Sequence, residues 1–163
     1  MSRKGLIVLG YPGIGKSSCG GTDGCVDLES SYFDHNESYC QLAESIADQG
    51  YTVFVSAHPN VVEYFSNKTW FLPNVARAVI FCPQKSMKEE WIERLHERWI
   101  STGTGKDLRA LRRAENFFVE DIENLCNSDL PVYQPNAIDY DLMRYICKMR
   151  KDWCETEAKT DDL

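Results

Sequence analysis

Short runs of apolar residues recur along the chain, and stretches with helical spacing separate them. Consecutive apolar residues are typical of parallel strands that are buried on both faces. Runs of this kind predict strands at residues 6–9, 25–28, 52–56, 76–82 and 131–133. Apolar residues three or four positions apart predict helices at residues 37–49, 60–66, 86–100, 107–126 and 138–153. Strands that alternate with helices predict a three-layer, doubly wound α/β fold with a parallel sheet of about five strands.

The length of the chain fits a single domain. With 163 residues, 43% of them apolar, the chain is long enough to bury one core. We expect this domain to cover residues 1–154 and a polar tail to follow at 155–163. In a doubly wound fold, ligands bind at the carboxyl ends of the strands, so candidate functional residues are sought there.

A helical lid is predicted between the fourth and fifth strands. Ser86 and Glu89 have the spacing of a capping box that opens a helix. The glycine- and threonine-rich segment 101–105 interrupts the helical pattern and predicts a hinge. We therefore interpret residues 86–126 as a lid built from two helices.

A phosphate-binding motif directly follows the first predicted strand. The sequence Gly10-Tyr11-Pro12-Gly13-Ile14-Gly15-Lys16-Ser17 matches G-x-x-x-x-G-K-[ST]. In such a loop, glycines let backbone N–H groups approach phosphate oxygens, the lysine reaches the β and γ phosphates, and the serine hydroxyl binds Mg²⁺. We expect ATP and Mg²⁺ as cofactors, with nucleotide contacts from Gly10, Pro12, Gly13, Ile14, Gly15, Lys16, Ser17 and Ser18.

Two acids follow the second predicted strand. Asp27 and Glu29 lie two positions apart, so strand alternation places both on the same side of the chain. Asp27 is a candidate to bind Mg²⁺ through water or to accept a proton from an acceptor hydroxyl, and Glu29 is a second candidate for the metal. The alternative is that both are solvated acids in a turn. His58, at the end of the third strand, is a candidate phosphate contact or a structural histidine.

Arginines on the first lid helix provide candidate phosphate clamps. Arg94 and Arg98 are four positions apart, so both project from one face of a helix and could reach phosphates when the lid closes. Many glutamates lie nearby, which leaves open that these arginines form surface ion pairs.

Charge and cysteine content restrict the class of partner. The formal net charge is -7, which argues against stable binding to nucleic acid or to a membrane surface. The seven cysteines contain no C-x-x-C pair, which favours reduced thiols and a cytoplasmic location. The segment 67–70, Asn-Lys-Thr-Trp, lacks the aspartate of a guanine-specificity motif, so adenine is the expected base.

On these residues the chain resembles the P-loop nucleoside and nucleotide kinase group, including small kinase-like P-loop proteins of phages and gut bacteria. The resemblance implies an ATP- and Mg²⁺-dependent phosphotransferase that acts on a nucleoside monophosphate, a nucleoside or a similar small metabolite. It implies catalytic roles for Lys16, Asp27, Arg94 and Arg98, and metal contacts from Ser17, Asp27 and Glu29. The glycine-rich break at 20–24 and the lack of a clear substrate motif depart from the group's pattern.

Two other functions fit the same motif. A P-loop protein can bind or hydrolyse ATP as a switch that acts through a partner. A protein that binds ATP after losing its metal acid is the third possibility. Neither the phosphoryl acceptor nor the oligomeric state follows from the sequence.

Overall fold

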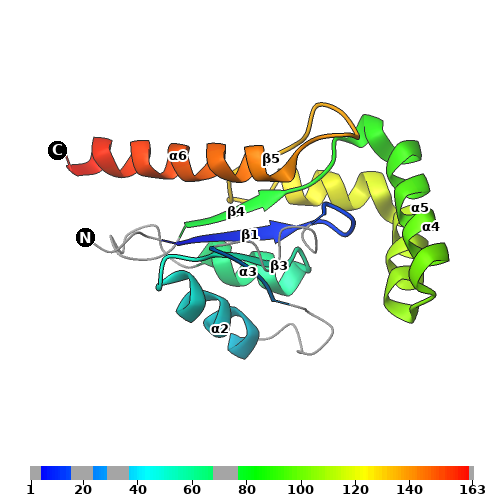
Figure 1. The fold of residues 1–163 in the computed structure, drawn as a ribbon, viewed down its shortest axis with the longest axis horizontal. Helices are drawn as coiled ribbons and strands as arrows, with labels where there is room; N and C mark the ends of the chain where they lie inside the picture. The colour runs from blue at the N-terminus through cyan, green and yellow to red at the C-terminus, as the bar shows by residue number, and fades with distance from the viewer. Residues whose placement is uncertain (1–4, 16–23, 29–36, 68–76, 162–163) are drawn as a thin grey trace.

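The computed structural model describes residues 5–15, 24–28, 37–67 and 77–161, and these residues form helices packed on a parallel sheet (Figure 1). The sheet has five strands in the order β2-β3-β1-β4-β5, and all pairs are parallel. The strands are β1 (Leu6–Gly10), β2 (Cys25–Asp27), β3 (Thr52–Ser56), β4 (Arg77–Phe81) and β5 (Val132–Tyr133). The five strands predicted from apolar runs are therefore confirmed.

The core of the sheet is β1, which lies between β3 and β4. Leu9 pairs with Val55 on one side and with Ile80 on the other, and all three side chains are fully buried. A strand in this position has no face toward water, because helices cover both faces of a parallel sheet. The burial of β1 thus explains the run of consecutive apolar residues at 6–9.

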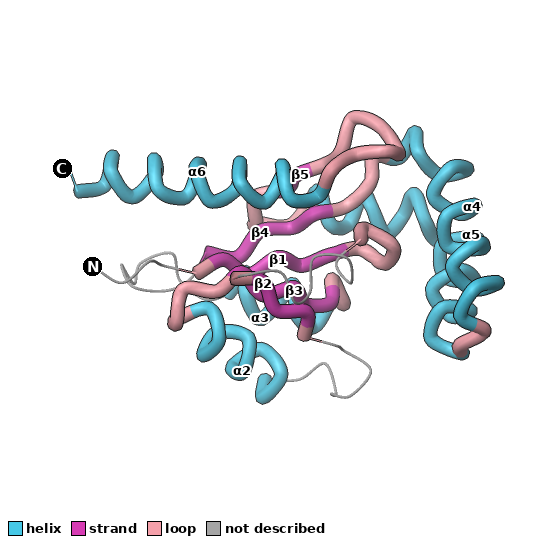
Figure 2. The backbone as a smooth tube through the Cα atoms, viewed as in Figure 1, coloured by secondary structure: helices cyan, strands magenta, loops and turns pink. Residues whose placement is uncertain are grey.

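Helices cover the two faces of this sheet (Figures 1 and 2). In the view of Figure 1, α6 runs along one face, and α2 and α3 lie on the other. This arrangement confirms the predicted three-layer α/β architecture with a five-stranded parallel sheet. The α-helices are α2 (Glu37–Ala47), α3 (Pro59–Asn67), α4 (Lys88–Thr102), α5 (Gly105–Cys126) and α6 (Leu142–Asp161).

The start of α4 differs from the predicted capping box. Ser86 lies inside a 3₁₀ turn, η2 (Lys85–Met87), and the N-cap of α4 is Met87, with no side-chain cap. The Met87 side chain is buried, and this contact fixes the turn so that the helix begins after it. The prediction of a cap by Ser86 and Glu89 was therefore wrong.

Helices α4 and α5 form an antiparallel pair beyond the carboxyl ends of the strands, and both lie at one end of the sheet (Figure 1). Gly103 ends α4 with a φ of 66°, a left-handed conformation that glycine adopts without steric cost. Thr104 caps α5 by accepting a hydrogen bond from the amide of Asp107. The predicted interruption at 101–105 is thus the turn between these helices. Helix α5 then bends at Phe117, whose backbone is not helical.

The strand order places a topological switch point beside β1. From β1 the chain continues to β2, at one edge of the sheet, whereas from β3 it crosses β1 in the opposite direction to reach β4. Adjacent strands whose connections leave in opposite directions open a crevice at their carboxyl ends, and ligands of doubly wound proteins bind there. The carboxyl ends of β1 and β3 are therefore the first place to look for a site.

The described part of the chain carries neither a disulfide nor a membrane-spanning helix. Of its cysteines, Cys25, Cys40 and Cys82 are buried and Cys126, Cys147 and Cys154 are exposed. Of the helices in this part, none combines the length and the apolar character needed to cross a bilayer.

Candidate functional site

The loop that leaves β1 has an unusual backbone conformation. The amide of Tyr11 still donates to the carbonyl of Phe81 on β4, at 3.0 Å, so the loop starts in register with the sheet. Gly13 and Gly15 then have φ angles of 90° and 99°. Residues with positive and negative φ in alternation turn successive N–H groups to one side of the chain, which makes a concave site for an anion.

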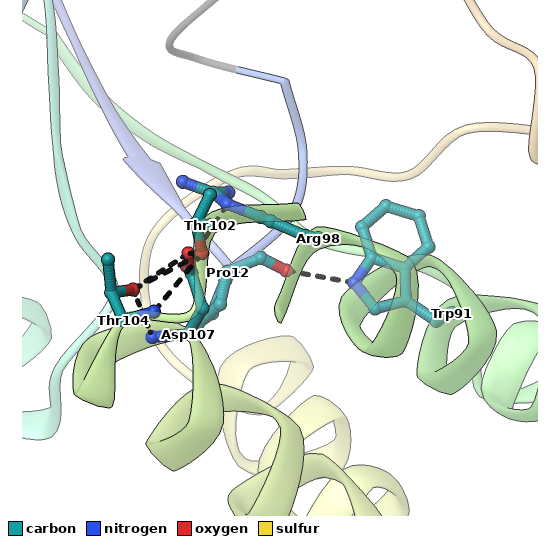
Figure 3. Close-up of polar contacts among 6 residues, drawn as sticks. All are labelled: Pro12, Trp91, Arg98, Thr102, Thr104 and Asp107. Carbon is teal, nitrogen blue, oxygen red and sulfur yellow. Dashed lines mark hydrogen bonds and ion pairs between the residues drawn. The ribbon is translucent and has the colours of Figure 1, made fainter. Parts of the chain in front are cut away.

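The carbonyl oxygens of three consecutive loop residues are held from outside the loop. Trp91 Nε1 donates to Pro12 O at 2.8 Å (Figure 3), and Arg94 Nη1 donates to Gly13 O at 3.2 Å. The Tyr140 hydroxyl donates to Ile14 O. We call Trp91, Arg94 and Tyr140 the carbonyl brace. Two of its members come from α4, and the third precedes α6.

The side chains of the carbonyl brace also contact one another. The rings of Trp91 and Tyr140 are parallel within 3°, with centroids 6.2 Å apart. The Arg94 guanidinium lies 4.7 Å from the Trp91 ring centroid and 5.3 Å from that of Tyr140, and it also donates to the carbonyl of Ile138. Because the three donors form one cluster, the three loop carbonyls point toward the same side.

The amides of the same peptide units therefore point away from the carbonyl brace. In a trans peptide, the C=O and the following N–H project in opposite directions, and the described residues contain no cis peptide. The carbonyls of residues 12, 13 and 14 thus direct the N–H groups of Gly13, Ile14 and Gly15 to the other side. No residue that the structure describes accepts a hydrogen bond from these three amides. Together they offer adjacent donors to an anion.

A cavity of about 630 Å³ opens beside this loop, at the switch point between β1 and β3. Its wall combines the start of the loop, the end of β3, the start of α3 and both parts of α5. A cavity of this size is in the range of small-molecule sites. Its lining residues with polar side chains are Tyr11, Ser56, His58, Glu63, Arg113, Asp121 and Asn124.

Tyr11 joins the loop to the cavity. Its ring makes edge contacts with Trp91 and Phe118, at centroid distances of 6.4 Å and 5.7 Å. Burial, with a further contribution from the negative charge of Asp121, raises the pKa of Tyr11 far above its usual value. The Tyr11 hydroxyl therefore keeps its proton at neutral pH.

His58 lies at the rim of the cavity and makes two local hydrogen bonds, and its contact with phosphate stays a prediction. Its Nδ1 atom accepts a hydrogen bond from the amide of Asn60, at 3.2 Å, in the first turn of α3. Its own amide donates to Ser56 Oγ at 3.1 Å. These two hydrogen bonds tie the end of β3 to the first turn of α3.

Asp27 lies at the carboxyl end of β2, as expected. Its Oδ1 atom is buried, and no described residue donates a hydrogen bond to it. Arg150 of α6 donates to Thr52 Oγ1, and Thr52 pairs with Cys25 in the sheet, so Cys25 lies on the face that α6 covers; strand alternation puts Asp27 on the same face. A buried carboxylate oxygen without a donor is costly, which makes it a candidate ligand-binding atom.

The structure gives different surroundings to the two predicted arginine clamps. Arg94 lies on the carbonyl side of the loop as part of the carbonyl brace. Arg98 pairs with Asp107 of α5, with 3.1 Å between Nε and Oδ1 (Figure 3). Of the pair, Arg94 alone contacts the described part of the loop, residues 10–15, and contact of either residue with phosphate stays a prediction. Burial acts to raise the pKa of Asp107, but hydrogen bonds from Thr102 and Thr104 and the charge of Arg98 lower it overall.

Several predicted site residues lie outside the described residues, namely Lys16, Ser17, Ser18 and Glu29. The roles predicted for them stay predictions. Within the described ranges, no three His, Cys, Asp or Glu side chains are grouped closely enough to hold a metal ion.

Sequence reasoning missed two parts of the site. Trp91 belongs to the apolar pattern that predicts the helix at 86–100; it is fully buried, and its indole nitrogen also holds the loop. A tryptophan has one donor that needs a partner when it is buried, and this is the signal that could have identified Trp91. Tyr140 and the Arg113–Asp121 pair have no comparable signal, since each depends on a long-range contact.

We compared the chain with protein-family models, with curated proteins and with solved structures, and none of the three searches found a match.

Proposed function

We propose that this chain is an ATP- and Mg²⁺-dependent phosphotransferase with a P-loop at residues 10–17, acting on a small metabolite. The observation that carries the proposal is the orientation of the Gly13, Ile14 and Gly15 amides, whose carbonyl partners are held by the carbonyl brace. This loop is also where the sequence places the G-x-x-x-x-G-K-[ST] motif. Amides oriented in advance bind a phosphate without the cost of ordering the loop.

The residues of this chain fit the groups that the motif requires. The three amides are suited to the β phosphate, with Lys16 reaching toward the β and γ phosphates. Ser17 would offer its hydroxyl to Mg²⁺, and Glu29 is the second acid assigned to the metal. The buried Oδ1 of Asp27 fits either a water bound to the metal or the hydroxyl of an acceptor. The metal would spread the negative charge of the phosphates during transfer.

The protein's part in the reaction is mainly positioning. The carbonyl brace fixes the loop against α4, so the donors keep their places while charge on the γ phosphoryl group redistributes. If the acceptor is a hydroxyl, Asp27 is the proposed base. Arg98 would reach phosphate only by exchanging the carboxylate of Asp107 for a phosphate oxygen, which a movement of α4 and α5 would allow. A nucleoside monophosphate, a nucleoside and other small hydroxyl compounds are the proposed acceptor classes.

The test is transfer of the labelled γ phosphate of ATP, with Mg²⁺, to a panel of nucleosides, nucleoside monophosphates and small hydroxyl metabolites. The control is Lys16→Ala, which removes the lysine and leaves the loop amides in place. A labelled product that disappears with Lys16→Ala supports the proposal. Absence of ATP binding by the wild-type protein would contradict it.

A second candidate is an ATP-dependent switch that acts through a protein partner. It is favoured by the exposed apolar side chains on the paired helices, where Ile100 of α4 is 67% exposed and Phe117 and Val119 of α5 are also exposed. ATP binding without transfer to any compound, together with ATPase activity that rises when a partner is added, would support this candidate over the first.

A further inference from the structure

The described residues of the cavity wall bring no surplus of positive charge. Their carboxylates and guanidinium group belong to Glu63, Asp121 and Arg113. The Arg113 guanidinium donates to both carboxylate oxygens of Asp121, at 2.8 Å each, so its charge is matched by a protein group. Glu63 then leaves the described part of the wall with a net negative charge, and this charge repels a phosphate monoester.

Two polar side chains of the wall have no partner among the described residues. Neither the amide of Asn124 nor the carboxylate of Glu63 makes a hydrogen bond or an ion pair within that part of the chain. An amide offers both donors and acceptors, and a carboxylate offers acceptors only. This set matches the hydroxyl groups of an uncharged ligand, in the way that a carboxylate binds the hydroxyls of a ribose.

The remainder of the wall is apolar. Val62 and Leu125 face the cavity together with Pro12, Pro59 and Ala110. Apolar walls with a few placed polar groups are typical of sites for small organic molecules. A ligand with a flat or apolar part and a set of hydroxyls would satisfy both kinds of surface.

We infer that this cavity is the acceptor site, and that it takes an uncharged, hydroxyl-bearing molecule such as a nucleoside in preference to a phosphate monoester. The inference rests on the proposed phosphotransferase function and narrows its acceptor class. In the transfer, the acceptor hydroxyl oxygen forms a bond to the γ phosphorus of ATP. The bond from that phosphorus to the bridging oxygen breaks, ADP leaves with the electron pair, and the hydroxyl proton passes to Asp27, the proposed base.

The inference is tested by measuring kcat/KM for matched pairs of acceptors, each nucleoside against its own 5′-monophosphate. Affinity for ATP and Mg²⁺ is measured separately with each protein. We expect the nucleosides to be the better acceptors by at least about tenfold, since a monophosphate would bring two negative charges beside Glu63. Equal or better transfer to the monophosphates would overturn the inference and leave the proposed function intact.

Variants of the wall show whether transfer uses this cavity. Val62→Phe narrows it and should lower kcat/KM for the nucleoside at least about tenfold with ATP affinity unchanged. Val119→Phe, the control, makes the same change on an exposed side chain of α5 outside the cavity. Asn124→Ala should raise the acceptor KM about fivefold through one lost hydrogen bond. Glu63→Lys should raise kcat/KM for the monophosphates relative to that for the nucleosides. Glu90→Lys, at an exposed position of α4, should leave this ratio unchanged.

Two remaining outcomes would also overturn the inference. Transfer to nucleosides that Val62→Phe leaves unchanged would place the acceptor elsewhere. ATP binding that depends on Lys16, without transfer to any uncharged compound, would remove the acceptor role of the cavity, and a protein that binds no ATP would lose the proposed function as well.

Discussion

Arg113 and Asp121 are eight positions apart on the same helix, yet the guanidinium of one donates two hydrogen bonds of 2.8 Å to the carboxylate of the other. In a straight α-helix, eight residues span about 12 Å, so this contact requires a bend between them. The bend occurs at Phe117, whose ring lies 4.3 Å from the Arg113 guanidinium carbon. The pair therefore joins the two parts of α5 across the bend, beside the cavity and Tyr11.

Removal of this pair should loosen the bend. We expect Asp121→Ala to lower the free energy of unfolding by about 1 kcal/mol, because the pair is bidentate but Arg113 is largely exposed to solvent. Urea denaturation measures the change. Glu115→Ala is the matched control, since it removes the single-bond pair with Arg112 and should have a smaller effect. Equal losses in the two variants would contradict a special role for the pair across the bend.

The two loop glycines should respond differently to alanine. Both have positive φ, so each substitution carries a backbone strain of about 1–2 kcal/mol. At Gly13 a Cβ would also lie 2.9 Å from Leu95 Cδ2 and 3.2 Å from Trp91 Nε1, while at Gly15 it would meet no described atom within 4 Å. Leu95 can move, but displacing Trp91 would break its hydrogen bond to Pro12.

We therefore expect Gly13→Ala to destabilise the protein more than Gly15→Ala and to weaken ATP binding further. Thermal unfolding and ATP titration of both variants measure the two effects. If Gly15→Ala destabilised the protein more than Gly13→Ala, packing of the loop against α4 would not explain why position 13 requires glycine.

The strands could be predicted because a strand that is buried on both faces needs consecutive apolar residues, and such runs are visible in the sequence. β1 and β3 are runs of consecutive apolar residues, and their pairing buries each side chain of the run. The start of α4 could not be predicted from local spacing, because the buried contact of Met87 decided it instead of the Ser86 hydroxyl. Similarly, helical periodicity alone predicts an unbroken helix over 107–126, and it does not show the bend at Phe117, which the pair between Arg113 and Asp121 spans.

The motif predicted where the loop lies in the chain, but it did not predict which side chains hold the loop. The donors that hold Pro12 and Ile14 lie 79 and 126 positions away in the chain. Spacing within one sequence carries no information on such contacts. For the same reason the hydrogen bond from Arg94 to the carbonyl of Gly13 was not predicted, and contact of Arg94 with phosphate stays a prediction. The identity of a side chain predicts what it can bind, and its surroundings decide what it does bind.

The carbonyl brace should affect nucleotide binding without touching the nucleotide. Tyr140→Phe removes only the hydroxyl that donates to Ile14, and we expect ATP binding about fivefold weaker through the loss of one hydrogen bond that holds the loop. Isothermal titration with ATP and Mg²⁺ measures this. Tyr51→Phe, at an exposed position, is the control.

Arg94→Ala should have a larger effect than Tyr140→Phe, because it removes donors to both Gly13 and Ile138. Arg94→Lys should not restore binding, since one ammonium group cannot reproduce the planar set of donors. ATP affinity that Arg94→Lys fully retains would indicate that Arg94 acts through its charge on the phosphates.

Acid should weaken the turn between α4 and α5 through Asp107. Its carboxylate is buried, accepts hydrogen bonds from the hydroxyls of Thr102 and Thr104, and pairs with Arg98. Because its pKa in the folded state is lowered from 3.8, the folded state binds this proton less readily than the unfolded state. The stabilisation is therefore fully present above the unfolded pKa and is lost as the pH falls through the lowered folded pKa.

Asp107→Asn should remove this pH dependence. At pH 7 we expect the variant to be less stable than the wild type by about 2 kcal/mol, since hydrogen bonds to a buried charged group are lost or weakened. As the pH falls from about 5 toward 2, the wild type should lose this advantage and the two unfolding curves should converge. Urea denaturation at a series of pH values measures the difference, and Asp129→Asn, at an exposed aspartate, is the control. A difference between wild type and Asp107→Asn that stayed constant over this range would show that the protonation of Asp107 is not linked to folding.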